Sequence, residues 1–268
     1  MGEKFEKISA RILTIVLGLP IILLTIHFGG ILYYSTIILI AILAFWELWH
    51  IIKHQEYQPS LILGVTLTIF FLFLKNISEL FSNVKLIFTL LFFLIILEHF
   101  FIKPHKRSIL NITLTIFMAL YIGHLLSFFI EIRGLTNGKV LLTFSLFCTW
   151  ISDIFAYLVG INFGKKHPFP YLSPNKTLEG AIGGFLSGGM CALAFYSILP
   201  LRIYTLLILG LIAAIAGQIG DLFESLIKRN FGVKDSGTLL PGHGGILDCM
   251  DSILFAIPIL YYTFQIVL

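Results

Sequence analysis

The side chains best suited to chemistry are concentrated in one segment of this otherwise apolar chain, residues 220–252. Its first part places two carboxylates, a hydroxyl and an ammonium at positions i, i+3, i+4 and i+7, which form one face of a helix. These four residues are Asp221, Glu224, Ser225 and Lys228. Two more carboxylates, Asp248 and Asp251, stand three residues apart at the start of a later apolar run, and a helix would again place them on one face.

A polar loop separates these two acidic groups, and its run Pro-Gly-His-Gly-Gly at 241–245 cannot belong to a helix interior. Glycines let a backbone approach a ligand closely, so this loop could cradle phosphate groups. Lys228, Arg229 and Lys234 alternate with the acids. Because carboxylates repel phosphates, the alternation favours divalent cations between acid and anion, and the implied metal is magnesium. The alternative is a solvated loop with ordinary salt bridges.

A second polar group lies within residues 149–180. Asp153 is near the middle of an apolar run, four residues before Tyr157, and an ionisable side chain there is costly enough to suggest a function. The alternative is a hydrogen bond between helices. The stretch 173–180 is typical of a helix start, in which Thr177 or Ser173 would cap the helix and free N–H groups would face an anion. An ordinary cap would look the same.

Both segments resemble the signatures of the phosphatidate cytidylyltransferases, also called CDP-diacylglycerol synthases. The first signature is matched by Ser225, Lys228, Arg229, Lys234, Asp235, Gly237, His243, Gly244, Gly245, Asp248 and Asp251. The second, D-x-x-A-Y-x-x-G followed by S-P-x-K-T-x-E-G, is matched by Asp153, Ala156, Tyr157 and Gly160 and by residues 173–180. This chain has Cys249 where the family usually has Arg, which puts a phosphate contact from that position in doubt.

The resemblance implies transfer of a cytidylyl group from CTP to phosphatidate, giving CDP-diacylglycerol and pyrophosphate. Asp221 and Asp248 are the first-choice Mg²⁺ ligands, with Asp251, Glu224 and Asp153 as auxiliary ligands, and a second cation is allowed for. The expected phosphate-binding and catalytic residues are Lys176, Lys228, Arg229, Lys234 and Asp235. The other expected substrate-binding residues are Ser173, Thr177, Ser225, His243, Gly244 and Gly245. A homodimer is also expected.

Composition predicts an integral membrane protein. The 268 residues are 58% hydrophobic and 12% charged, with a mean hydropathy of +0.98. Soluble domains carry about 25% charged residues, and they could not hide so much apolar surface. The net charge of +4 suits contact with anionic lipid and does not indicate a nucleic-acid partner.

Apolar runs predict an all-α, polytopic membrane bundle of about nine helices. The expected spans are 11–28, 30–50, 60–74, 83–101, 109–132, 140–161, 179–199, 202–222 and 246–267. Within this single bundle, 1–138 carries no recognised motif and 139–268 is the catalytic region. Glycines at 183, 184, 188, 189, 210, 217 and 220 favour close packing of helices. Trp46, Glu47, Trp49 and His50 are interpreted as anchors at a membrane interface.

Positive charge predicts the orientation, because cytoplasmic loops are rich in Lys and Arg. Thirteen of the 18 basic residues fall in the segments expected on the same side of the membrane as the N-terminus. They are Lys4, Lys7, Arg11, Lys53, Lys103, Lys106, Arg107, Lys165, Lys166, Lys176, Lys228, Arg229 and Lys234. The N-terminus and both motif loops are therefore expected in the cytosol, in a bacterial inner membrane. A transporter and a related lipid or polyprenol kinase are the competing functions.

Overall fold

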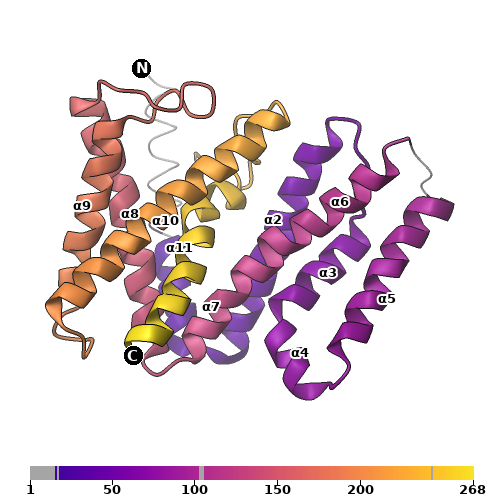
Figure 1. Ribbon diagram of the computed structural model, residues 1–268, viewed down its shortest axis with the longest axis horizontal. Helices are drawn as coiled ribbons and strands as arrows, with labels where there is room; N and C mark the ends of the chain where they lie inside the picture. The colour runs from indigo at the N-terminus through magenta and orange to yellow at the C-terminus, as the bar shows by residue number, and fades with distance from the viewer. Residues whose placement is uncertain (1–15, 17, 103–105, 243) are drawn as a thin grey trace. The chain divides into compact units, whose positions relative to one another are not determined.

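The computed structural model describes residues 16, 18–102, 106–242 and 244–268 (Figure 1). These residues form helices joined by loops, with no β-strand among them and one isolated bridge between Leu240 and Gly244. The longer helices are α2 (Gly30–Lys53), α3 (Ile62–Leu72), α5 (Val84–Leu97), α6 (Ser108–Ala119), α7 (Leu125–Gly134), α8 (Gly138–Phe163), α9 (Leu178–Leu193), α10 (Ile203–Asn230) and α11 (Ile246–Val267). The short elements are α4 (Leu74–Leu80), η1 (Glu98–Ile102) and η2 (Leu120–His124). The all-α prediction is confirmed.

Six helices of the described chain are long and apolar enough to cross a membrane: Gly30–Lys53, Val84–Ile102, Ser108–Gly134, Gly138–Phe163, Ile203–Asn230 and Ile246–Val267. A seventh span arises if α3 and α4 count together, and this pair is bent by 72°. The helices at Gly18–Phe28 and α9 are shorter. At 1.5 Å per residue, the 16 residues of α9 extend about 24 Å, less than the roughly 30 Å of a bilayer core. The expected count of nine spans is not confirmed.

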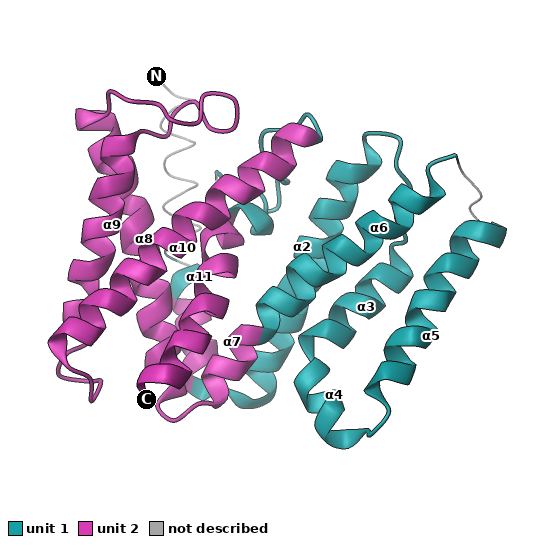
Figure 2. Ribbon diagram, in the orientation of Figure 1, with its two compact units in different colours: residues 1–19, 28–127, 231–248 teal, residues 20–27, 128–230, 249–268 magenta. Residues whose placement is uncertain are grey.

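The chain divides into two compact units, which Figure 2 colours separately. Unit 1 consists of residues 1–19, 28–127 and 231–248. Its core includes Leu67, Phe70 and Ile95, which come from α3 and α5. The helices of this unit approach closely at glycines, because a Cβ on Gly123 would collide with the backbone oxygen of Thr68.

Unit 2 consists of residues 20–27, 128–230 and 249–268, and small residues let its helices α8, α9 and α10 pack closely. A Cβ on Gly184 would lie 2.7 Å from the backbone oxygen of Ser152. A Cβ on Gly188 would lie 2.8 Å from the Ala214 side chain and 3.0 Å from the Gly210 oxygen. The predicted role of these glycines in helix packing is confirmed.

Two further glycines bring α8 and α11 against α10. A Cβ on Gly217 would lie 2.8 Å from Cγ2 of Thr149 on α8 and 3.5 Å from Cβ of Ser252 on α11. One turn later, a Cβ on Gly220 would collide with the backbone oxygen of Asp251. Three acidic residues lie next to these contact points: Asp153, Asp221 and Asp251. The close approach of the helices at the two glycines therefore holds the three acids near one another.

Candidate active site

An acidic cluster lies where α8, α10 and α11 meet in unit 2. Asp153 on α8, Asp221 and Glu224 on α10, and Asp251 on α11 lie close enough for their charges to interact. The hydroxyl of Ser252 contacts Asp153, and the Ser252 N–H donates to Oδ1 of Asp251 at 2.6 Å. The structure thus brings together four of the five acids that the sequence singled out as metal ligands.

Lys176 supplies a positive charge to this cluster. Its Nζ lies 2.7 Å from Oδ2 of Asp221, and the two side chains are 30% and 32% exposed. Because both groups remain partly hydrated, the ion pair contributes modestly to stability, about 0–1 kcal/mol for most such pairs. Its main effect is to orient both side chains.

Glu224 and Lys228 form a second ion pair one turn further along α10, deeper in unit 2. Nζ of Lys228 lies 3.1 Å from Oε1 of Glu224, and the side chains are 11% and 0% exposed. A buried pair of this kind is costly to break, because the remaining charge has no partner. The predicted helical face with Asp221, Glu224, Ser225 and Lys228 is confirmed, and its buried part is held by this ion pair.

Two of the acids, Asp153 and Asp221, line a pocket of about 560 Å³ within unit 2 together with Lys176. Asp153, Lys176, Thr177 and Asp221 supply polar groups to its wall, and Tyr157 is among the ring side chains that line it. Small-molecule sites are typically about 300–1,000 Å³, with apolar walls and a few convergent polar groups. Four predicted site residues, from the two polar segments 149–180 and 220–252, therefore line one pocket of suitable size.

The carboxyl oxygens of the cluster are ligands of the kind that bind divalent cations. Four carboxyl groups stand beside two ammonium groups, those of Lys176 and Lys228. Hard oxygen ligands of this type are those that Mg²⁺ prefers. Among the residues that the structure describes, no three His, Cys, Asp or Glu side chains already stand in metal-binding geometry.

The segment before α9 folds as the capping prediction requires. Thr177 is the N-cap, and its Oγ1 accepts a hydrogen bond from the Gly180 N–H at 3.1 Å. Ser173 does not cap the helix, and its carbonyl accepts from the Lys176 N–H at 3.1 Å in a turn. Oε2 of Glu179 accepts from the N–H groups of Lys165 and Lys166, at 2.9 and 3.2 Å. These bonds fix the segment that carries Lys176.

The glycine-rich loop belongs to unit 1, where it wraps around the carboxylate of Asp248. Oδ2 of Asp248 accepts from the Ser236 N–H at 2.8 Å, the Ser236 hydroxyl at 2.9 Å and the Gly245 N–H at 2.8 Å. The same oxygen lies against Gly244, whose φ of 103° and lack of Cβ allow the approach. In the structure, then, the glycines of this loop closely approach a carboxylate of the protein itself.

Glu47 is the residue that the sequence analysis missed. It lies on α2 with 1% of its surface exposed and accepts hydrogen bonds from the loop residues Ser236, Ile246 and Leu247. The interpretation of Glu47 as an interface anchor is wrong, because a buried carboxylate with three donors does not face headgroups. One signal was present, since Glu47 is an acid within a run of apolar residues.

The remaining predicted residues have varied positions. Lys234 and Asp235 are exposed in the loop of unit 1. In unit 2, Ser225 is buried on α10, and Arg229 is exposed and donates to the Leu172 carbonyl at 3.3 Å. His243 lies outside the described residues. The substrate contacts of these residues stay predictions.

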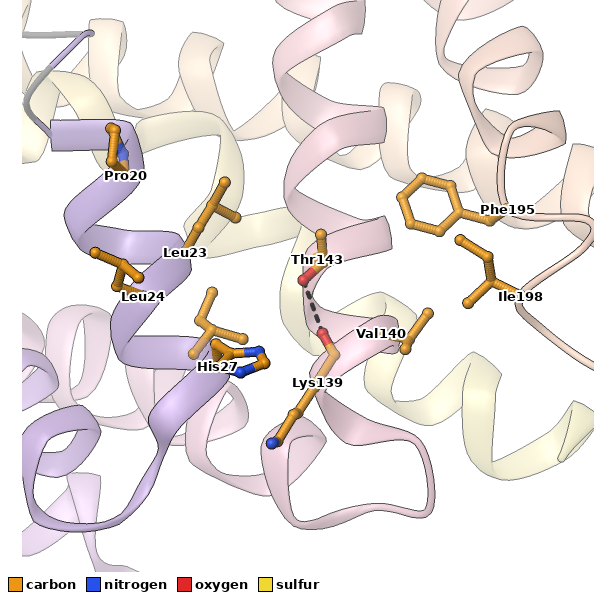
Figure 3. A pocket seen from close by; sticks show the side chains of 10 residues that line it. Pro20, Leu23, Leu24, His27, Lys139, Val140, Thr143, Phe195 and Ile198 are labelled. Atoms are coloured by element: carbon orange, nitrogen blue, oxygen red, sulfur yellow. Dashed lines mark hydrogen bonds between the residues drawn. The ribbon is translucent and has the colours of Figure 1, made fainter.

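A second pocket in unit 2, of about 670 Å³, is lined mainly by apolar side chains, and Lys139 and His27 are also among its lining residues (Figure 3). The dashed line in Figure 3 is the hydrogen bond from the Thr143 hydroxyl to the Lys139 carbonyl, at 2.8 Å. None of the predicted site residues lines this pocket. The candidate active site is therefore the pocket beside Asp153 and Asp221.

Comparison with known proteins gives one consistent result. The profile of the "Cytidylyltransferase family" matches residues 9–267. The chain is 35% identical over 257 residues to the phosphatidate cytidylyltransferase of Bacillus subtilis (strain 168), covering 94% of this chain and 96% of the relative. It is 32% identical over 254 residues to that of Staphylococcus haemolyticus (strain JCSC1435), covering 94% and 97%. The match runs through both units and both signatures, and the chain belongs to the cytidylyltransferase family.

Proposed function

We propose that this protein transfers the cytidylyl group of CTP to phosphatidate, giving CDP-diacylglycerol and pyrophosphate. The observation that carries the proposal is the pocket of unit 2, which is lined by Asp153, Lys176 and Thr177 of the second signature and by Asp221 of the polar segment 220–252. Membership of the family and the names of the relatives support the same reaction.

For this reaction the protein must position the two substrates and neutralise the charge of their phosphate groups. A phosphate oxygen of phosphatidate attacks the α-phosphorus of CTP, and the bond from that phosphorus to the bridging oxygen of the β-phosphate breaks. The electron pair leaves with pyrophosphate. A phosphomonoester has a second pKa of about 6, so the attacking group is already ionised at neutral pH and needs no protein base.

Lys176 is the residue best placed to attract the triphosphate. Its ammonium lines the pocket and lies 2.7 Å from Asp221, which keeps it oriented toward the acidic cluster. Arg229, Lys228 and Lys234 are the further phosphate-binding candidates from the signature. A cation that contacts the leaving pyrophosphate stabilises the charge that builds up in the transition state.

The acidic cluster gives the reaction its cation site. Asp221 would hold Mg²⁺ with Asp153, Glu224 and Asp251 as auxiliary ligands, and Asp248 of unit 1 stays a predicted ligand. The ion would supply neutralisation of the phosphate charges that carboxylates otherwise repel. A second cation is part of this proposal.

The membrane setting fits a substrate with two acyl chains. We infer an integral protein of a bacterial inner membrane, with the N-terminus and both motif loops in the cytosol, where CTP is found. The excess of basic residues on the N-terminal side supports this orientation. A homodimer is also proposed.

Purified protein incubated with CTP labelled at the α-phosphate, Mg²⁺ and phosphatidate tests the proposal. We expect label in the lipid fraction, dependent on phosphatidate. Transfer from CTP labelled at the γ-phosphate would instead support a lipid kinase. Lack of labelled lipid with either nucleotide would refute nucleotide-dependent lipid transfer and favour a transporter.

A further inference from the structure

Glu47 is a buried carboxylate on a helix that carries none of the family signatures. It lies in the last third of α2, which is long and apolar enough to span a membrane. A charged group in such a place is costly and is retained where it has a specific partner. All the hydrogen-bond donors recorded for Glu47 come from residues 236–247, about 190–200 positions later in the chain.

Two of these donors are the first N–H groups of α11. The Ile246 N–H donates to Oε1 of Glu47 at 2.9 Å, and the Leu247 N–H donates to Oε2 at 2.9 Å. The initial N–H groups of a helix have no partner within the helix, and an acid placed there also interacts favourably with the helix dipole. Glu47 therefore caps α11 from another helix.

The third donor links Glu47 to Asp248. The Ser236 hydroxyl lies 3.0 Å from Oε2 of Glu47 and 2.9 Å from Oδ2 of Asp248, and its single proton donates to one of the two acids at a time, so this serine connects them. The glycines fit this arrangement, because a Cβ on Gly237 would lie 2.9 Å from Oε1 of Glu47. A Cβ on Gly245 would collide with Oε2. The loop backbone thus packs against Glu47 as closely as against Asp248.

We propose that Glu47 is a positioning residue for cytidylyl transfer, which fixes the start of α11 and the loop 236–247 and thereby sets the direction of the Asp248 carboxylate. The proposal rests on the proposed function. Glu47 contacts the loop and the start of α11 and does not line the pocket beside Asp153 and Asp221, so its loss should reduce turnover more than substrate affinity.

The first test compares Glu47→Gln with the wild type in steady-state kinetics. Glutamine keeps the size of the side chain but replaces one acceptor oxygen with an NH₂ group, which would face an N–H donor. A charge-assisted hydrogen bond is worth a factor of roughly 10 to 100, so kcat should fall by about that factor. The KM values for CTP and phosphatidate should change by a smaller factor than kcat.

A matched control separates positioning from general stability. Trp49 lies on the same helix, and its indole N–H donates to the Pro59 carbonyl at 2.9 Å, away from the loop. Trp49→Phe should lower the unfolding temperature and leave kcat near the wild-type value. If the two variants lose activity in proportion to their loss of unfolding temperature, Glu47 is only a stabilising residue and the proposal is overturned.

A second readout follows the loop without using activity. Thr238 is exposed in the loop, and a cysteine introduced there can be labelled with a maleimide, measured against the parent protein that keeps its natural cysteines. Glu47→Gln should raise the labelling rate at position 238, and Trp49→Phe should not. An unchanged rate in Glu47→Gln would contradict the proposal.

Two further variants cover the case in which Glu47→Gln does not fold. Glu47→Asp keeps both acceptor oxygens and should retain more activity than Ser236→Ala, which removes the bridging hydroxyl. The opposite order would count against the bridge. If the wild type makes no CDP-lipid, the proposed function fails, whereas the labelling comparison still decides whether Glu47 holds the loop.

Discussion

Replacing Gly245 with alanine gives the sharpest test of the packing between the loop and Glu47. The new Cβ would collide with Oγ of Ser236 and Oε2 of Glu47 and would lie 2.6 Å from Cδ of Glu47. Ordinary contact begins at 3.4 Å, so the carboxylate or the loop must move by about 0.8 Å. Gly245 is buried, which leaves little room for this movement.

The energetic effect follows from the hydrogen bonds that the movement breaks. Oε2 of Glu47 accepts from the Ser236 hydroxyl at 3.0 Å and from the Leu247 N–H at 2.9 Å. A displacement of about 0.8 Å takes both beyond the roughly 3.5 Å at which such a bond is lost. Each bond to a charged group contributes about 1.5–3 kcal/mol, so a destabilisation of about 3 kcal/mol or more is expected.

The assay pairs thermal unfolding in detergent with the α-labelled CTP assay, and Gly134→Ala is the control. A Cβ on Gly134, at the end of α7, meets nothing within 4 Å, so this variant carries the same chemical change without a collision. Gly245→Ala should unfold at a lower temperature than Gly134→Ala and should lose most of its turnover. Equal unfolding temperatures and equal turnover would refute the reasoning.

Four further predictions concern the site and the topology. Asp221→Asn keeps the shape of the side chain but removes the charge that a divalent cation requires, so activity should fall by orders of magnitude with membrane insertion intact. Near-normal turnover of this variant at saturating Mg²⁺ would show that Asp221 is not a ligand. Lys176→Ala should raise the KM for CTP by about 10- to 100-fold as a charge-assisted contact is lost, and an unchanged KM would show that Lys176 serves only Asp221. If the Arg that the family usually has at this position contacts phosphate, rather than only holding an acidic neighbour in place, Cys249→Arg should lower the KM for CTP or phosphatidate by roughly 10- to 100-fold, and unchanged constants would show that position 249 does not face the substrates. A cysteine at Thr238 should be labelled only from the cytosolic face and one at Asn137 only from the opposite face, and the reverse pattern would overturn the orientation.

Local rules and the family signatures together predicted the acidic site of unit 2. Helical spacing predicted the face with Asp221 and Glu224, and the cap preference of threonine predicted the role of Thr177. The meeting of Asp153 with Asp221 depends on contacts such as Gly217 with Thr149, which no periodicity reveals. Only the resemblance placed the two acids in one site before the structure was known.

Glu47 shows what the sequence could not reveal. Its partners lie 189–200 residues away, and neither helical spacing nor any motif links positions so far apart. The neighbouring tryptophans favoured an interface interpretation. The glycines of the run 241–245 were expected to approach a ligand, whereas in the structure Gly245 closely approaches the carboxylate of Glu47 on α2.

The distance along the chain between Glu47 and its donors has a consequence for biosynthesis. Glu47 emerges from the ribosome 199 residues before Ile246. At roughly 5–20 residues per second, the carboxylate waits about 10–40 s for the N–H groups that it will cap. Until then α2 carries an acid without these partners, and the loop around Asp248 cannot take its final shape. The loop is therefore completed only after Ile246 and Leu247 have been made, so this part of the protein is assembled long after α2.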